Sequence, residues 1–199
     1  MARRYMERSV AEQNSLDMAW ALLQKKKYRH LRSCIGGKDL REERRFRELV
    51  TNSVMSTDLG DKELKNLRDN RWKVAFNNSN KDKKDEDFFV SVNRKATIII
   101  EHLMQASDVA HTMQHWDIYR EWNENLFNEM YAAYRLGRSD KDPATFWYEG
   151  ELGFFDFYII PLSKKLDECG VFGISSDENL NYALANRVSF CFVLRLLFS

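Results

Sequence analysis

The stretch EHLMQASDVAHTMQHWDIYREWNENLFNEM, residues 101–130, decides how the rest of the chain is interpreted. It places one acid, Asp108, just past a run rich in apolar residues, 98–104. The residues after Asp108 predict an amphipathic helix with many aromatic side chains. Because an acid at the end of a buried segment is costly unless it is paired or bound to a metal, Asp108 is a candidate metal ligand. The helix that follows is a candidate pocket wall.

Length and composition predict one all-α domain, a compact multi-helix fold that spans residues 1–199. A chain of 199 residues is long enough to bury a real core. Only eight glycines and two prolines interrupt its long periodic segments, which is typical of an all-α protein. Lysine and arginine total 31 and aspartate and glutamate 30, so the overall charge favours neither nucleic acid nor a membrane surface as a partner.

Cysteine usage and the N-terminus favour a cytoplasmic protein. Cys34, Cys169 and Cys191 share no metal-binding or disulfide spacing, which favours reduced thiols. The opening residues, MARRYMERSV, lack the apolar stretch of a signal peptide. No apolar run approaches the roughly 20 residues that a membrane-spanning helix needs. We therefore expect no membrane span.

Apolar periodicity predicts the helices and the breaks between them. Ser9 and Glu12 have the spacing of a capping box at the start of a helix over 9–24, and Ser175 and Glu178 have it for a short helix to about 187. Pro161 is expected to kink or end the apolar segment 148–169. The other predicted helices are 41–57, about 61–75, 92–107 and 115–136, with an exposed loop over 77–87 and a further start at Asp142–Pro143.

The C-terminal segment 188–199, VSFCFVLRLLFS, differs from the rest of the chain. It is apolar without helical amphipathy and too short to cross a membrane. Such a tail is either a core element or a segment foreign to the domain, and we expect the second.

Taken alone, Asp108 is weak evidence for a metal. An aspartate that caps a helix or forms a salt bridge is the more frequent interpretation. His102 and His111 flank it, but the chain contains no His-Asp pair. A two-metal hydrolytic site needs several converging ligands around ions roughly 3.5–4 Å apart, and the sequence offers no obvious set.

Four short segments, in order, resemble the class I 3′,5′-cyclic nucleotide phosphodiesterase catalytic domain. They are SVAEQNS at 9–15, MSTDLGD at 55–61, ASDVAHT with DIYREWNENLFNEM across 106–130, and GELGFFDFYIIPL at 150–162. The last contains GFFDFYIIPL, which is similar to the family signature G-F-[IV]-D-[FY]-[IV]-x-x-P-[LT]. The resemblance runs from about residue 9 to residue 187. It implies hydrolysis of cAMP, cGMP or both to 5′-nucleotides in cyclic nucleotide signalling.

The resemblance also implies roles for individual residues. Asp108 matches the family's metal-ligating aspartate, and Glu12 matches a glutamate that contacts the metal site through water. Leu59 matches a residue that lines the substrate pocket after a Thr-Asp dipeptide. In the complete domain the family holds two divalent ions, zinc and magnesium or manganese.

The implied substrate pocket lies mainly on the residues after Asp108. Phe154 matches the aromatic residue that stacks on the purine, and Leu126 would close the other side of this clamp. The remaining matches to the pocket wall are Tyr119, Trp122 and Met130, which share one helix face with Leu126 by their spacing. Core packing is the alternative interpretation of each apolar residue, and spacing alone favours it.

Four positions depart from the family pattern. The family's glutamine, which reads the purine edge, falls at Glu151, and an ionised carboxylate can only accept hydrogen bonds. This weakly favours adenine over guanine, unless the pocket reads something else. His111 stands where the family often has asparagine. Asn14 and Ser15 replace the paired histidines that follow the matched glutamate in many members.

The family's H-N-x-x-H and H-D-x-x-H motifs do not occur in these 199 residues. The resemblance implies that they lie upstream of Met1, in a missing N-terminal part of the same domain. We therefore expect the C-terminal portion of a catalytic domain, inactive alone because it lacks the general-acid histidine and most metal ligands. The alternative is a non-catalytic helical module that binds a purine nucleotide or a protein partner.

Overall fold

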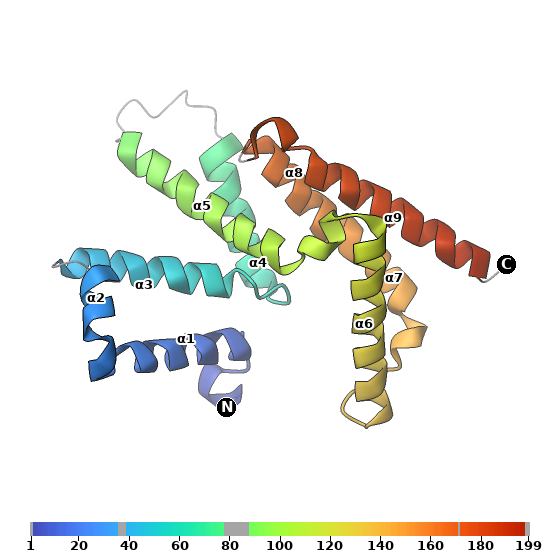
Figure 1. Cartoon of the computed structure of the whole chain (residues 1–199), viewed down its shortest axis with the longest axis horizontal. Helices are drawn as coiled ribbons and strands as arrows, with labels where there is room; N and C mark the ends of the chain where they lie inside the picture. The colour runs from blue at the N-terminus through green and yellow to red at the C-terminus, as the bar shows by residue number, and fades with distance from the viewer. Residues whose placement is uncertain (1, 36–38, 78–87, 171, 198–199) are drawn as a thin grey trace. The chain divides into compact units, whose positions relative to one another are not determined.

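The computed structural model describes residues 2–35, 39–77, 88–170 and 172–197, and within these ranges it contains helices and no strand, which confirms the all-α fold class. The chain divides into two compact units, Met1–Gln105 and Ala106–Ser199. The α-helices are α1 Val10–Leu23, α2 Arg29–Ile35, α3 Leu40–Met55, α4 Lys62–Trp72, α5 Phe88–Asp108, α6 Trp116–Arg135, α7 Trp147–Phe154, α8 Ile160–Glu168 and α9 Glu178–Leu197 (Figure 1).

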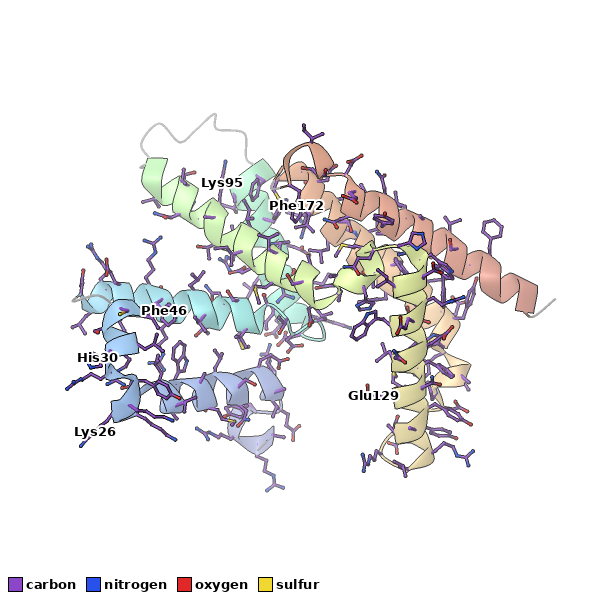
Figure 2. The ribbon with its side chains drawn as sticks, in the orientation of Figure 1. Lys26, His30, Phe46, Lys95, Glu129 and Phe172 are labelled. Carbon is purple, nitrogen blue, oxygen red and sulfur yellow. The ribbon has the colours of Figure 1, made fainter. Side chains whose placement is uncertain are left out.

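In the first unit, α1 and α3 lie side by side and α2 joins them (Figure 1). Phe46, labelled in Figure 2, lies on α3. Its ring meets that of Trp20 on α1 edge to face, with ring centroids 6.2 Å apart. The guanidinium of Arg47 lies 5.4 Å from the centre of the same indole ring, within cation–π range. The apolar spacing that predicted helices over 9–24 and 41–57 thus supplies the contact between them.

The predicted capping box at Ser9 does not form. Ser9 precedes α1 with φ of 41°, in the left-handed region, and its side chain makes no capping hydrogen bond. Its hydroxyl instead donates to Oδ2 of Asp58, 2.6 Å away. Asp58 is 49 residues from Ser9 in the sequence. Local spacing therefore could not show that Asp58, rather than the end of α1, would bind the Ser9 hydroxyl.

A buried carboxylate joins α4 and α5 within the first unit. Glu101 is only 2% exposed, and both of its oxygens accept from Nη1 of Arg71, at 2.8 and 3.0 Å. Burial raises the pKa of Glu101, and the positive charge of Arg71 opposes that rise. Ser56 donates to the Glu101 carbonyl at 3.3 Å, while Gln105 donates to the Ser56 carbonyl at 3.0 Å. These bonds attach the end of α3 to α5.

In the second unit, α8 and α9 pack along each other and α6 also contacts α9 (Figure 1). Phe155, Ile159 and Leu166 are fully buried there. Asn186 of α9 is also buried, and its amide donates to the carbonyls of Thr112 at 3.0 Å and Gln114 at 2.7 Å. These two bonds satisfy backbone acceptors of the turn between α5 and α6 that would otherwise be costly to bury.

Pro161 does not end the predicted segment, but a π-helical turn interrupts the α-helical pattern just before it. The segment predicted as 148–169 divides into α7, a π-helical turn Phe155–Ile159 and α8. Pro161 lies in the first turn of α8, where its missing N–H leaves no intrahelical bond unmade. Asp142 caps the single 3₁₀ turn Pro143–Thr145 through the Ala144 N–H at 2.9 Å.

The expectation that residues 188–199 are foreign to the core is wrong for Phe190. The helix predicted to end near 187 continues as α9 to Leu197. Phe190 is only 6% exposed, and its ring lies 6.2 Å from Tyr119 and 6.0 Å from Tyr148. The burial of Phe190 could not be predicted from the sequence, because both of its aromatic partners come from helices that are distant along the chain.

Other sequence-based expectations have mixed outcomes. The helices predicted over 41–57 and 115–136 correspond to α3 and α6, and the helix predicted over 92–107 begins earlier, at Phe88. Most of the predicted loop 77–87 lies outside the described residues. Across the ranges that the structure describes, no helix combines the length and apolar character needed to cross a bilayer.

Replacing Arg71 by methionine should destabilise the protein by about 2–3 kcal/mol, because it removes the cation that donates to both oxygens of the buried Glu101 carboxylate. Urea unfolding followed by circular dichroism at 222 nm measures this loss. Arg120→Met is the matched control, because Arg120 is exposed and pairs with Glu124 at 3.9 Å, a contact worth about 0.5 kcal/mol or less. Equal losses for the two variants would contradict the role assigned to Arg71.

Candidate functional site

Four side chains of α6 and α7 form a hydrogen-bonded network in the second unit. Nε1 of Trp147 donates to Oδ1 of Asn123 at 3.3 Å. Nδ2 of Asn123 donates to Oε2 of Glu151 at 2.7 Å and to the Tyr119 hydroxyl at 3.3 Å. The Tyr119 hydroxyl in turn donates to the same Glu151 oxygen at 2.8 Å. The network thus brings two predicted site residues, Tyr119 and Glu151, into direct contact.

Aromatic packing fixes the position of this network. Tyr119 is 1% exposed, and its ring meets Phe155 nearly edge to face at 5.3 Å. Trp147 is held in a similar way by Phe127 of α6, with ring centroids 5.1 Å apart. The side chains that hold Glu151 therefore have little freedom to turn away from it.

Burial dominates the electrostatics of Glu151. It raises the pKa of the Glu151 carboxyl, and the hydrogen bonds from Tyr119 and Asn123 oppose that rise. The pKa of Tyr119 is also raised, first by burial and then by the adjacent carboxylate, so its hydroxyl keeps its proton. Neutral donors, rather than a cation, thus compensate the Glu151 charge.

Phe154, the candidate purine-stacking residue, ends α7 and is half-buried. Its ring lies parallel to that of Tyr158, with centroids 5.4 Å apart and planes at 5°. Tyr158 therefore covers part of one face of Phe154. A planar ligand would have to stack on the opposite face.

The residues of α6 that were predicted to form the pocket wall differ in their exposure to solvent. Tyr119 belongs to the core, whereas Trp122 is 58% exposed and Leu126 is 45% exposed. Met130 is half-buried. The His111 ring lies 5.8 Å from the indole of Trp122 at an angle of 32°, so these two predicted residues do meet.

Asp108, the candidate metal ligand, is exposed and is the last residue of α5. Burial lowers the pKa of His111, and the negative charge of Asp108 opposes that effect. His111 and His115 have a helical metal-ligand spacing, but the structure separates their roles. His111 lies in the 3₁₀ turn Ala110–Met113, whereas His115 caps α6 by accepting from the Asp117 N–H at 3.4 Å.

The other two predicted site residues belong to the first unit. Glu12 lies in the first turn of α1, and Leu59 lies just after α3, and both are half-buried. Among the described residues, no three His, Cys, Asp or Glu side chains gather into a group that could hold a metal ion. The described residues therefore do not fit a two-metal centre by themselves.

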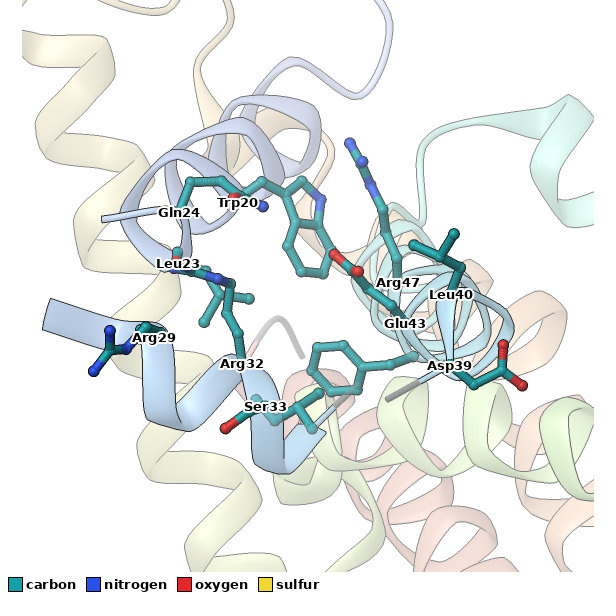
Figure 3. A pocket seen from close by; sticks show the side chains of 12 residues that line it. Trp20, Leu23, Gln24, Arg29, Arg32, Ser33, Asp39, Leu40, Glu43 and Arg47 are labelled. Atoms are coloured by element: carbon teal, nitrogen blue, oxygen red, sulfur yellow. The ribbon is translucent and has the colours of Figure 1, made fainter. Parts of the chain in front are cut away.

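A separate cavity of about 330 Å³ lies among α1, α2 and α3 of the first unit (Figure 3). Trp20 and Phe46 form part of its wall, and Arg29, Arg32 and Arg47 also line it. None of the predicted site residues lines this cavity, so it is distinct from the expected substrate pocket.

Sequence reasoning missed Asn123 and Trp147. A signal was present, because Asn123 follows Tyr119 by four residues and Trp147 precedes Glu151 by four. Side chains four residues apart share one helix face, so each missed residue stands beside a predicted one. The pairing between the two helices could not be deduced from spacing.

Asn123→Ala should lower the free energy of unfolding by about 1–2 kcal/mol more than Asn128→Ala, because it removes a donor from the half-buried Glu151 carboxylate. Asn128 is an exposed position of the same helix, so both changes carry the same gain in helix propensity. Urea unfolding at pH 8 measures the difference. Variants of equal stability would show that the Asn123 bond does not compensate Glu151.

The fold has clear counterparts among solved structures. Two crystal structures from the choanoflagellate Salpingoeca rosetta match 98% of this chain at 16% sequence identity. One is the phosphodiesterase domain of a rhodopsin phosphodiesterase, with a TM-score of 0.67, and the other is the phosphodiesterase domain of a RhoPDE fusion protein, with a TM-score of 0.68. The chain covers 58% and 61% of those two structures, so it spans about three fifths of their length. No curated protein sequence matches significantly.

A family model gives the more specific result. The 3′5′-cyclic nucleotide phosphodiesterase model matches residues 1–171, which include Asp108 and the whole Tyr119–Asn123–Trp147–Glu151 network. This match covers most of the chain and agrees with the sequence resemblance found in its four short segments. The chain therefore belongs to the 3′5′-cyclic nucleotide phosphodiesterase family.

Proposed function

We propose that this chain forms the purine-binding portion of a single catalytic domain that hydrolyses 3′,5′-cyclic nucleotides to 5′-nucleotides in cytoplasmic signalling. The observation that carries this proposal is the family match over residues 1–171. Its substrates would be cAMP, cGMP or both. The geometry of the second unit supports the assignment, because a predicted base-reading residue, Glu151, is held in a fixed orientation by its neighbours.

The purine would stack on Phe154, with Leu126 on its opposite face and Glu151 at its edge. Aromatic stacking on a base is tolerant of sequence and contributes about 1–3 kcal/mol per base in nucleic-acid complexes. Trp122, Met130 and His111 would complete the part of the pocket wall that lies in the second unit. The exposure of Trp122 and Leu126 supports this role, since large apolar side chains at a surface often mark a binding site.

The two metal ions of the complete domain, zinc and magnesium or manganese, would need ligands in addition to Asp108 and Glu12. Asp108 offers one exposed carboxylate, and Glu12 would act through water. We propose that the histidine ligands and the general acid come from another part of the domain. In support, no three His, Cys, Asp or Glu side chains among the described residues form a group that could hold a metal ion. Residues 1–199 would then supply the base-binding pocket and one metal ligand.

Purified residues 1–199 should not hydrolyse cAMP or cGMP at enzyme-like rates when Zn²⁺ and Mg²⁺ are supplied. Phosphate-release or chromatographic assays of 5′-nucleotide formation measure this directly. Asp108→Asn is the control, because any trace of contaminating hydrolysis should be unchanged in that variant. Enzyme-like turnover that Asp108→Asn abolishes would contradict the proposal that the metal site is incomplete.

Phe154→Ala should weaken cAMP binding by roughly 5–100-fold, the loss expected for one stacking contact. Isothermal titration calorimetry with the purified chain measures the affinity. Phe157→Ala is the matched control, because Phe157 lies on the adjacent turn and is 73% exposed. If folded wild-type protein binds cAMP and both variants retain its affinity, Phe154 does not stack on the base.

A further inference from the structure

The cavity among α1, α2 and α3 has an apolar part and a positively charged part. Trp20 and Phe46 supply the aromatic part of its wall, and the side chains of Arg29, Arg32 and Arg47 line it as well (Figure 3). Its volume of about 330 Å³ is in the range of small-molecule sites, which combine apolar walls with a few polar groups. A ligand that fits both parts of the wall joins an apolar body to a negative charge.

Arg32 is held at the cavity by the C-terminal end of α1. Its Nη1 atom donates to the carbonyl oxygens of Leu23 at 2.5 Å and Lys25 at 3.1 Å. A guanidinium has five N–H donors, and the described residues offer no acceptor to the Nε and Nη2 atoms of Arg32. These atoms can therefore bind an anion while Nη1 keeps the side chain in place.

Arg29 and Arg47 also lack a carboxylate partner in the part of the chain that the structure describes. Nη2 of Arg29 lies 3.4 Å from Nε2 of His30, and the Arg47 guanidinium lies 5.4 Å from the centre of the Trp20 indole. Neither an imidazole nor an indole carries a negative charge, so both contacts leave the guanidinium charge uncompensated.

Two acidic residues line the same cavity, and they differ in what they already bind. One oxygen of Asp39 accepts from the Arg41 N–H at 2.9 Å, and the other lies 3.5 Å from Nε of Arg41. Glu43, in the first turn of α3, forms no ion pair with any described residue. The charge of Asp39 is thus partly compensated, whereas that of Glu43 would weaken the binding of an anion.

The sequence beside the cavity adds positive charge. Residues 25–32, KKKYRHLR, include five lysines and arginines, and no acidic residue occurs between Asp17 and Asp39. Gln24 and Arg29, on either side of the three lysines, both line the cavity, so these exposed lysines lie beside its rim. Like charges around a concave site reinforce one another and attract ions of the opposite sign. The small net charge of the whole chain conceals this local excess.

We propose that this cavity binds an organic phosphate monoester, with its phosphate paired with the lining arginines and its carbon skeleton against Trp20 and Phe46. A phosphate monoester carries a charge of about −1.5 to −2 at neutral pH and has three acceptor oxygens. Planar guanidinium groups match this geometry with paired N–H donors. The site lies in the first unit and shares no lining residue with the proposed purine pocket, so the proposal does not depend on the proposed function.

Calorimetry of the full chain with phenyl phosphate, inorganic phosphate and phenol tests whether both parts of the wall contribute. Phenyl phosphate should bind about tenfold or more tightly than either of the other two probes, because only it pairs a charge-assisted hydrogen bond with an apolar contact. Equal affinities for phenyl phosphate and inorganic phosphate would overturn the proposal, since they would indicate general attraction of anions to a basic surface. Phe154→Ala should bind phenyl phosphate as the wild type does, and a loss of binding in this variant would place the ligand in the second unit instead.

Glu43→Gln should tighten phenyl phosphate binding about threefold or more, because it removes a negative charge from the cavity wall. Glu42→Gln is the matched control, because Glu42 also lies in the first turn of α3 but does not line the cavity. Both changes alter the net charge and the charge at the helix end equally. Equal effects of the two substitutions would contradict binding in the cavity.

Arg47→Gln should weaken phenyl phosphate binding about tenfold or more, the loss expected for one charge-assisted hydrogen bond. Arg44→Gln, at an exposed position of the same helix that does not line the cavity, should leave the affinity unchanged. Equal affinities of these two variants would overturn the proposal. If Arg47→Gln does not fold, as judged by circular dichroism, the comparison of Glu43→Gln with Glu42→Gln decides.

Vesicle sedimentation separates two sources of the phosphate monoester, a soluble metabolite and a lipid headgroup. Phosphatidylcholine vesicles are compared with and without a phosphoinositide whose headgroup carries a phosphate monoester. Sedimentation of the chain only with the phosphoinositide, reduced by Arg47→Gln and not by Arg44→Gln, would identify a lipid headgroup. Binding of phenyl phosphate without sedimentation would identify a soluble ligand. If folded protein binds neither phenyl phosphate nor these vesicles, the proposal is wrong.

Discussion

Each compact unit contains a glutamate whose carboxylate is partly or fully buried, and hydrogen bonds to that carboxylate connect neighbouring helices. In the first unit, Glu101 is nearly inaccessible and meets the cation of Arg71 on the neighbouring helix. In the second unit, Glu151 is less deeply buried and meets only neutral donors, Tyr119 and Asn123. Burial raises the pKa of both carboxyl groups. The positive charge of Arg71 opposes that rise at Glu101, whereas hydrogen bonds from neutral donors oppose it at Glu151.

Most helices of this chain could be predicted from apolar spacing, because each has one face that packs on a neighbour. The spacing identified α3 and α6 closely and placed a break near Pro161. The failures came from long-range partners. Ser9 donates to Asp58 rather than capping its own helix, and Phe190 is buried by two aromatic rings from other helices. Sequence periodicity reports which face is apolar, but it does not report which distant group will meet a polar side chain.

The sequence predicted only part of the candidate site. Tyr119 and Glu151 were found by resemblance to the phosphodiesterase family, and the structure joins them by a hydrogen bond. Asn123 and Trp147 were not found, although each lies one helical turn from a predicted residue. They determine which atom of Glu151 is engaged, and that information exists only when α6 and α7 are placed against each other. A resemblance can therefore supply the identity of a site residue while leaving its hydrogen-bonding direction unknown.

Helix α9 supports the Tyr119–Asn123–Trp147–Glu151 network without contributing a residue to it. The family match ends at residue 171, yet Phe190 of α9 packs against Tyr119, and Asn186 fastens the turn that precedes α6. The tyrosine that contacts Glu151 thus rests on a helix outside the family-matched segment. Substitutions in α9 would act on Glu151 indirectly, by shifting the ring of Tyr119, whose hydroxyl donates to Glu151. Sequence changes in this C-terminal helix could therefore alter the polar environment of Glu151 while every residue of the network stays the same.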